Sequence, residues 1–313
     1  LVVAGLFQAC GLTSQLKKAD KKYDIGEYYT AADLYKRLYT RIPAKQKAQR
    51  ANIAFRQAEC YRILNFSMAE MNYTNAIRNG YADSVIFLRY AQVLHRNAKY
   101  KDAEKNYFEY LKYDSTNAQA RNGLKLLKLA ESLKKQPTPY VVKIADALNS
   151  RRSHTFSPAF QSADGDVLFF TSDRQISKKK QQKNTGITGL PQNAMYSCRK
   201  NAIGKWEKPE LMTSETAQTV SADDGVPCFS SDGNTMYFTR ARQQANSDSG
   251  TEIFVSTRAG GAWSEPKKIS IFKDSTISVA HPALSSDGTT LIFVSDSKQG
   301  KGGKDLWGAT ISG

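Results

Sequence analysis

The chain has few of the residues from which catalytic and metal sites are usually built. Its 313 residues include four cysteines and three histidines, and His281 has no Cys or His beside it at metal-ligand spacing. The sequence contains no His-Glu-x-x-His motif, no Gly-x-Ser-x-Gly motif and no phosphate-cradling glycine loop. It therefore predicts no catalytic residue, no metal and no cofactor, and it favours a protein that is not an enzyme.

The four cysteines are also too few and too scattered to form a disulfide framework. Cys60 falls in a helical segment, while Cys198 and Cys228 occupy positions that hold small residues in sister repeats. Nothing in their spacing requires a disulfide bond, and nothing excludes one.

Acidic residues are scarce relative to basic ones. The chain has 29 Asp and Glu against 45 Lys and Arg, and residues 1–136 alone hold 12 against 24. A basic domain commonly indicates an acidic partner, and nucleic acid is one candidate. No nucleic-acid motif is present, so we expect no nucleic acid as a partner. The alternative is a basic face that only contacts water.

Long apolar runs are absent except for Leu1–Ala9, which is too short to cross a bilayer but fits the apolar part of a signal peptide. Cys10 follows Ala9 directly, as at the end of a bacterial lipoprotein signal. We interpret residues 1–10 as a signal remnant ending in a lipidated Cys10, in a sequence clipped at its start. The alternative is a secreted protein with an incidental cysteine.

Residues 11–136 have helical periodicity and predict a tetratricopeptide repeat domain. Three units each carry an aromatic residue, an alanine three residues later and a second aromatic four residues further on, beginning at Tyr28, Phe66 and Tyr100. This spacing, at steps of 38 and 34 residues, is typical of tetratricopeptide repeats. Residues 117–135 would form a capping helix. One continuous helical bundle is the alternative.

A tetratricopeptide solenoid has a concave face built by the first helix of each pair. In register, the predicted partner-binding groove combines aromatic, cationic and amide side chains, namely Tyr61, Arg62, Gln92, His95 and Arg96. Aromatic residues and arginine are common interface anchors. The alternative is that each of them is an ordinary surface residue.

Residues 137–156 predict a linker, because prolines at 137 and 139 end the last helix. Within it, the apolar stretch from Tyr140 to Ile144 predicts a strand that leads into the next domain.

Residues 157–313 repeat a strand–turn–strand pattern three times. Its turn has the form Ser-x-Asp-Gly, with the glycines at Gly165, Gly233 and Gly288. A third strand follows in each unit and a fourth strand in the first two, and both faces of the second strand are apolar. Such four-stranded units predict about three blades of a β-propeller. An ordinary β-sandwich is the alternative. Three blades do not close a ring, so we expect the chain to be part of a longer protein.

Together, these repeats resemble a known family. The pattern Pro-x-Phe-Ser-x-Asp-Gly-x-x-Leu-x-Phe, followed by Gly-Gly-x-Asp-Leu-Trp and Gly-x-Trp-x-x-Pro, is similar to the TolB-like (PD40, WD40-like) propeller. The order of lipoprotein cysteine, tetratricopeptide repeats and PD40 blades resembles OmpA-family lipoproteins of Bacteroidota, a group linked to the type IX secretion system.

The resemblance implies a lipid-anchored protein on the periplasmic face of the outer membrane. It implies a scaffold that docks other envelope proteins of a secretion or gliding machinery. Peptidoglycan binding would come only through an OmpA-like domain that is absent here. The sequence leaves two other functions open, namely a periplasmic module that binds a peptide or glycan through the propeller, and an enzyme in which the propeller caps a peptidase domain.

Overall fold

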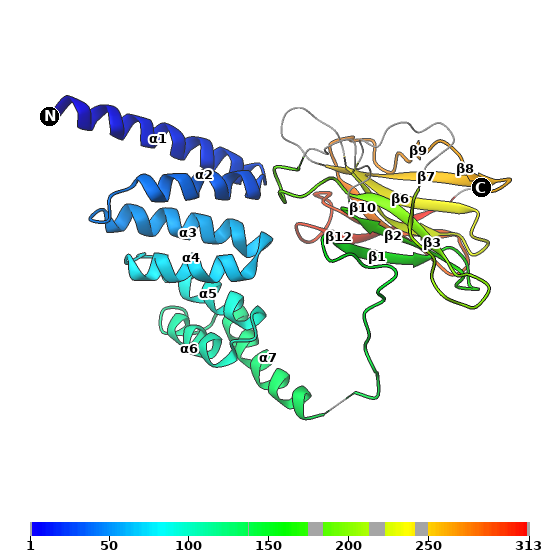
Figure 1. Ribbon diagram of the computed structural model, residues 1–313, viewed down its shortest axis with the longest axis horizontal. Helices are drawn as coiled ribbons and strands as arrows, with labels where there is room; N and C mark the ends of the chain where they lie inside the picture. The colour runs from blue at the N-terminus through cyan, green and yellow to red at the C-terminus, as the bar shows by residue number, and fades with distance from the viewer. Residues whose placement is uncertain (1, 137, 175–183, 213–222, 242–249, 312–313) are drawn as a thin grey trace. The chain divides into compact units, whose positions relative to one another are not determined.

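The computed structural model describes the chain apart from residues 1, 137, 175–183, 213–222, 242–249 and 312–313, and it describes only the backbone of residues 2–11. The chain divides into two units (Figure 1). A helical unit comprises residues 1–142 together with 185–189, and a β unit comprises residues 143–184 and 190–313.

The helical unit is a stack of antiparallel helices joined by short turns (Figure 1). Its described helices are α1 (Val2–Asp24), α2 (Tyr28–Arg41), α3 (Lys47–Leu64), α4 (Phe66–Arg78), α5 (Val85–Arg96), α6 (Tyr100–Leu111) and α7 (Ala118–Lys135). The pairs α1–α2, α3–α4 and α5–α6 are the three predicted repeats. The tetratricopeptide-like fold predicted from the sequence is confirmed.

A small residue brings the two helices of each pair together. Ala31, Ala69 and Ala103, near the start of α2, α4 and α6, are all completely buried. Because alanine has no side chain beyond Cβ, the partner helix can approach closely at these points. The second aromatic of each repeat, such as the fully buried Tyr35, then fills the core one turn further on.

The helix α7 closes the stack where the sequence placed a capping helix. Its N-cap is Asn117, whose side chain accepts a hydrogen bond from the N–H of Ala120 at 3.1 Å. One side of α7 packs on the repeat before it through Gly123, where a Cβ would overlap the ring of Tyr107. The sequence needs glycine here for space and not for backbone freedom.

The predicted strand from Tyr140 to Ile144 is wrong. The segment has no regular secondary structure, and its apolar side chains are open to solvent, with Val142 91% and Ile144 76% exposed. A strand needs a neighbour for its N–H and C=O groups, and no described strand pairs with this segment. The stretch is apolar and β-branched, so its composition alone suggested a strand.

The described residues of the β unit form three antiparallel sheets, each built from consecutive strands. The first sheet is β1 (Thr155–Phe160), β2 (Val167–Ser172), β3 (Ala194–Arg199) and β4 (Glu210–Leu211). The second is β5 (Asp224–Phe229), β6 (Thr235–Ala241), β7 (Thr251–Ala259) and β8 (Ala262–Trp263), with β9 (Lys267–Lys268) also on β7. The third is β10 (Val279–Leu284), β11 (Thr290–Ser295) and β12 (Asp305–Thr310). This arrangement is an incomplete, propeller-like β domain.

The sheets pack face to face through apolar side chains. Phe169 and Met195 of the first sheet share a core with Met236, Phe238 and Trp263 of the second. A separate core joins the second sheet to the third. Because β2 and β6 bury side chains on both faces, the sequence pattern predicted their covered position correctly.

Each sheet begins with the same strained bulge. Ser157, Val226 and His281 have φ of 51°, 55° and 56°, and each precedes a proline. The pairing register breaks at this point in β1, β5 and β10. Positive φ is unfavourable for a β-branched residue such as valine, so surrounding contacts must hold it in place.

A threonine of the preceding sheet supplies one of those contacts. The N–H of Val226 donates to Oγ1 of Thr171 at 3.0 Å, and the N–H of His281 donates to Oγ1 of Thr239 at 2.9 Å. The bulge in one sheet therefore fixes its distance from the sheet before it.

Candidate functional site

Tyr61, the first predicted groove residue, lies at the C-terminal end of α3. It packs against the cores on both sides of that helix and is only partly exposed. Burial raises the pKa of its hydroxyl above the ordinary value of 10.0. Part of this side chain therefore stabilises the solenoid, and only the remainder can reach a partner.

Arg62, the second, already has an ionic partner. Its guanidinium lies 3.0 Å from the carboxylate of Glu59, one turn earlier on α3, and the hydroxyl of Tyr73 donates to the same carboxylate. Glu59 is 8% exposed, so it is a buried charge that needs these two donors. Burial first, and then Glu59, raise the pKa of Tyr73 far above its usual range. Arg62 is therefore partly a structural residue of the second repeat.

The three predicted residues on α5 point toward different neighbours. Nε2 of Gln92 donates to Oε1 of Gln119 on α7 at 3.4 Å. The ring of His95 meets Tyr100 of α6 edge-on at 5.7 Å, and burial lowers the pKa of the imidazole below 6.5. The guanidinium of Arg96 lies over the ring of Phe66 at 4.5 Å. Among the described residues, no hydrogen bond or ion pair joins any two of the five predicted groove residues.

The helix α7 carries an apolar surface that was not predicted from the sequence. Leu126, Leu129 and Leu133 are 52%, 50% and 56% exposed. Their spacing of three and four residues places them on one side of the helix. That spacing is visible in the sequence, but residues 117–135 were predicted only as a capping helix, with no face assigned. We call these three residues the leucine stripe.

The cysteines of the described side chains are free thiols. Cys60 and Cys198 are buried, and Cys228 is partly buried. Burial raises the pKa of Cys60 and of Cys228 to about 12, so neither is a thiolate at neutral pH. Cys10 lies within the backbone of α1, and its side chain is outside the described residues.

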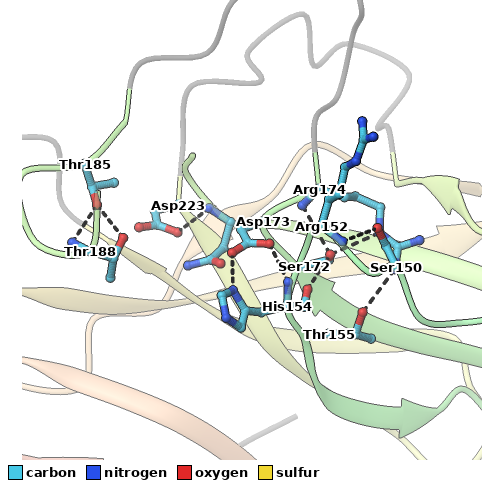
Figure 2. Close-up of polar contacts among 11 residues, drawn as sticks. Ser150, Arg152, His154, Thr155, Ser172, Asp173, Arg174, Thr185, Thr188 and Asp223 are labelled. Carbon is cyan, nitrogen blue, oxygen red and sulfur yellow. Dashed lines mark hydrogen bonds and ion pairs between the residues drawn. The ribbon is translucent and has the colours of Figure 1, made fainter. Parts of the chain in front are cut away.

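The β unit has a polar network at the start of the first sheet, and Figure 2 shows its members. Asp173 is buried. One of its carboxylate oxygens accepts from the backbone N–H of His154 at 2.7 Å, and the other lies 2.6 Å from Nδ1 of the same histidine. The imidazole itself is 68% exposed. A buried carboxylate thus orients an exposed histidine, an arrangement that active sites also use.

No nucleophile of the described residues completes this pair. The hydroxyl of Ser172 donates to the backbone carbonyl of His154 at 2.6 Å and not to its ring. It also accepts from Nε of Arg174 at 3.0 Å, while Nη2 of Arg174 donates to the carbonyl of Leu148 at 2.7 Å. These bonds anchor the segment before β1 to the end of β2.

The third sheet shows that the role of Asp173 is structural. Asp296 follows β11 as Asp173 follows β2, and its carboxylate accepts from the N–H of Ser278 at 2.8 Å, just before β10. The same carboxylate-to-backbone bond therefore recurs without a histidine. His154 is an addition to a structural turn, and the sequence analysis had placed it in the linker.

A second carboxylate, Asp223, lies just before β5. It accepts from the N–H of Asn193 at 2.8 Å, and burial raises its pKa above 3.8 (Figure 2). Within the described residues, no group of three or more His, Cys, Asp or Glu side chains is placed to hold a metal ion. Likewise, none of the described helices is both long and apolar enough to cross a membrane.

No protein-family model and no curated protein matches the chain. Among solved structures, the first tetratricopeptide domain of human RPAP3 is 20% identical with a TM-score of 0.34, covering 41% of this chain and 97% of that one. The Arabidopsis OM64 tetratricopeptide domain is 18% identical with a TM-score of 0.33, covering 38% and 95%. A Mycobacterium tuberculosis puromycin-hydrolysing peptidase is 16% identical with a TM-score of 0.34, covering 51% of this chain and 22% of its own.

Proposed function

We propose that the protein is a non-enzymatic scaffold that docks other proteins. The observation that carries this proposal is the helical unit, in which three helix pairs and a capping helix form a tetratricopeptide-like stack. Such a stack has little chemistry of its own and a long surface for contacts. The leucine stripe on α7 adds apolar area of the kind that protein partners cover.

The proposal extends to the place of action. The order of Cys10, helical repeats and PD40-like sheets resembles that of OmpA-family lipoproteins, and most of all that of PorE from the type IX secretion system. We infer an outer-membrane lipoprotein on the periplasmic side, anchored at Cys10, that docks envelope proteins of a secretion machinery. A link to peptidoglycan belongs to this proposal only through an OmpA-like domain, and no residue of this chain is assigned to it.

Anchoring is tested by changing Cys10 to serine in the full chain with a signal peptide. The parent should stay in the membrane pellet after a high-salt wash and should incorporate labelled fatty acid. The Cys10→Ser variant should do neither, because non-lipidated chains have only weak surface contacts. Cys198→Ser is the matched control, since Ser256 occupies the same place in the second sheet. A Cys10→Ser variant that remains in the washed pellet contradicts the anchor.

Docking is tested separately with the full chain on beads and a detergent extract of envelopes. A scaffold should retain a defined set of envelope proteins in reproducible amounts, and the set should shrink when the helical surface is altered. Retention of no protein above an unrelated basic control would contradict the scaffold function.

A further inference from the structure

The helix α7 has two apolar sides, and within the described part of the helical unit only one of them is buried. Ala120, Gly123 and Leu127 are buried against α5 and α6. The leucine stripe lies elsewhere on the helix and is about half exposed at each position. The buried residues of α7 all lie on the other side.

An apolar outer side is unusual for a helix in this place. The last helix of a repeat stack normally has a polar outer face, because no further repeat covers it. Figure 1 shows α7 as the last helix of the stack. The hydrogen bond from Gln92 to Gln119 ties the start of α7 to α5 on the side predicted to form the groove.

The charges around the leucine stripe have one sign. Lys125 and Lys128 each precede a stripe leucine by one residue, which places them about 100° away around the helix. Over its whole length, α7 carries five basic residues and one acidic residue, Glu131. The stripe therefore has positive charge along one of its borders.

We infer that α7 binds an acidic amphipathic helix of a partner protein through the leucine stripe. A helix with apolar residues spaced three and four apart would lay them against Leu126, Leu129 and Leu133. Its glutamates and aspartates would then face Lys125 and Lys128. This inference rests on the proposed scaffold function and adds to it the chemistry of the partner.

The charge selects this partner over two others. A second copy of α7 would bring its own excess of basic residues to the stripe, and like charges across an interface are repulsive. A membrane-surface helix needs a broad apolar face that sinks into lipid. The broader apolar side of α7 is buried in the protein, which leaves three leucines in a narrow row.

The experiment measures binding of the full chain to a fluorescent synthetic peptide made of leucine, alanine and glutamate, with leucines at helical spacing. The triple variant Leu126→Gln, Leu129→Gln, Leu133→Gln should weaken binding about tenfold or more, because it removes the apolar contact. Lys125→Glu with Lys128→Glu should weaken it by a similar factor and should restore binding to a peptide with lysine in place of glutamate.

Matched controls keep the result specific. Phe108→Gln removes an apolar side chain that is 54% exposed on α6, and it should leave affinity unchanged. Lys101→Glu with Lys105→Glu makes the same charge change on α6 and should lower affinity much less. Circular dichroism of each variant confirms that its helices are intact.

Other outcomes overturn the inference. These are equal binding by parent and leucine variant, and absence of peptide binding at millimolar concentration. They also include leucine-dependent binding to anionic vesicles without peptide binding, and self-association that the leucine variant abolishes. If the leucine variant retains the same envelope proteins as the parent, the scaffold function stands and its assignment to α7 falls. If neither chain retains any, the scaffold function itself fails.

Discussion

Ile253 in β7 and Leu306 in β12 occupy the same place in the repeated sheet, yet they have opposite environments. The strand register pairs Thr239 with Ile253 and Val294 with Leu306. Ile253 is completely buried by the third sheet, whereas Leu306 is 77% exposed. No described sheet packs on the face of the third sheet that holds Leu306.

The second and third sheets therefore have the same fold, but only the second is stabilised by a described sheet on this face. Local features, such as the turn and the bulge, are the same in both. Burial is supplied by a neighbour, so it differs between them. Substitutions at equivalent positions can separate the stability that comes from a sheet's own residues from the stability that comes from contact with the next sheet.

The largest expected difference is between Ile253→Ala and Leu306→Ala. Truncating a completely buried isoleucine should lower the free energy of unfolding by about 2–5 kcal/mol, because it leaves a cavity. The same truncation at Leu306 should change it by less than about 0.5 kcal/mol, because the side chain is mostly in water. Urea denaturation of both variants makes the measurement. A loss above about 2 kcal/mol at Leu306 would mean that this face is covered in solution.

The next largest effect concerns the threonine that holds each bulge. Thr239→Val removes the acceptor for the N–H of His281 while keeping the side-chain volume. Leaving a partly buried N–H without a partner should cost about 1–3 kcal/mol. The third sheet has Val294 at this place, so Val294→Thr should be neutral within about 0.5 kcal/mol. Thermal denaturation of the two reciprocal variants tests the pair, and equal costs would refute a neighbour-dependent role.

The repeats made the fold predictable from the sequence, but not the burial of individual residues. The Ser-x-Asp-Gly turns and the paired aromatics recur, so both fold classes and the capping helix were predictable from spacing alone. Environment was not predictable in the same way. The pattern at Ile292 matches that of Phe169, but Ile292 is 42% exposed and Phe169 is 3% exposed. Periodicity reports which face a residue occupies and not whether that face is covered.

In the helical unit, too, the sequence predicted the position of the groove residues along their helices but not their contacts. Register placed Arg62 on the first helix of its pair, but it could not show that Glu59 already holds this charge. Nor could it show that the leucine stripe on α7 is surplus to the core. Both facts depend on contacts between helices, which a pattern within one helix does not contain.

A smaller effect distinguishes the middle sheet from the first. Arg240 makes a two-pronged ion pair with Asp224 at 2.7 and 2.8 Å, above the rings of Phe238 and Phe254. Arg174 lies over the equivalent aromatic pair of the first sheet, but there its bonds are accepted by the hydroxyls of Ser172 and Thr155 and by a backbone carbonyl.

We expect Asp224→Asn to cost about 1 kcal/mol, after allowance for partial exposure of the pair. Thr155→Asp should raise the free energy of unfolding by part of that amount, because it gives Arg174 of the first sheet a carboxylate partner. Unfolding at low and high salt provides the measurement. A cost for Asp224→Asn that does not fall with added salt would point to packing instead of charge.

The smallest expected effect is the lowered pKa of an aspartate in each turn. It should be equal in all three sheets, because it depends on local features only. Asp164, Asp232 and Asp287 lie in the three Ser-x-Asp-Gly turns. Each accepts from the serine hydroxyl two residues earlier, at 2.9, 2.5 and 2.5 Å, and from a backbone N–H two residues later. These hydrogen bonds hold the pKa of each carboxyl below 3.8.

A carboxyl group whose pKa is lowered in the folded state adds stability above its unfolded pKa, which is 3.8 here. That contribution is lost as the pH falls from 3.8 through the folded value. Because the turns are local and open to water, Asp287 in the third sheet should titrate like Asp164 and Asp232, even though no described sheet packs on the outer face of that sheet. Carbon-detected NMR titration of the three aspartates measures this. An ordinary pKa at Asp287 alone would show that the turn depends on a covering sheet, and the division between local and neighbour-supplied features would then fail.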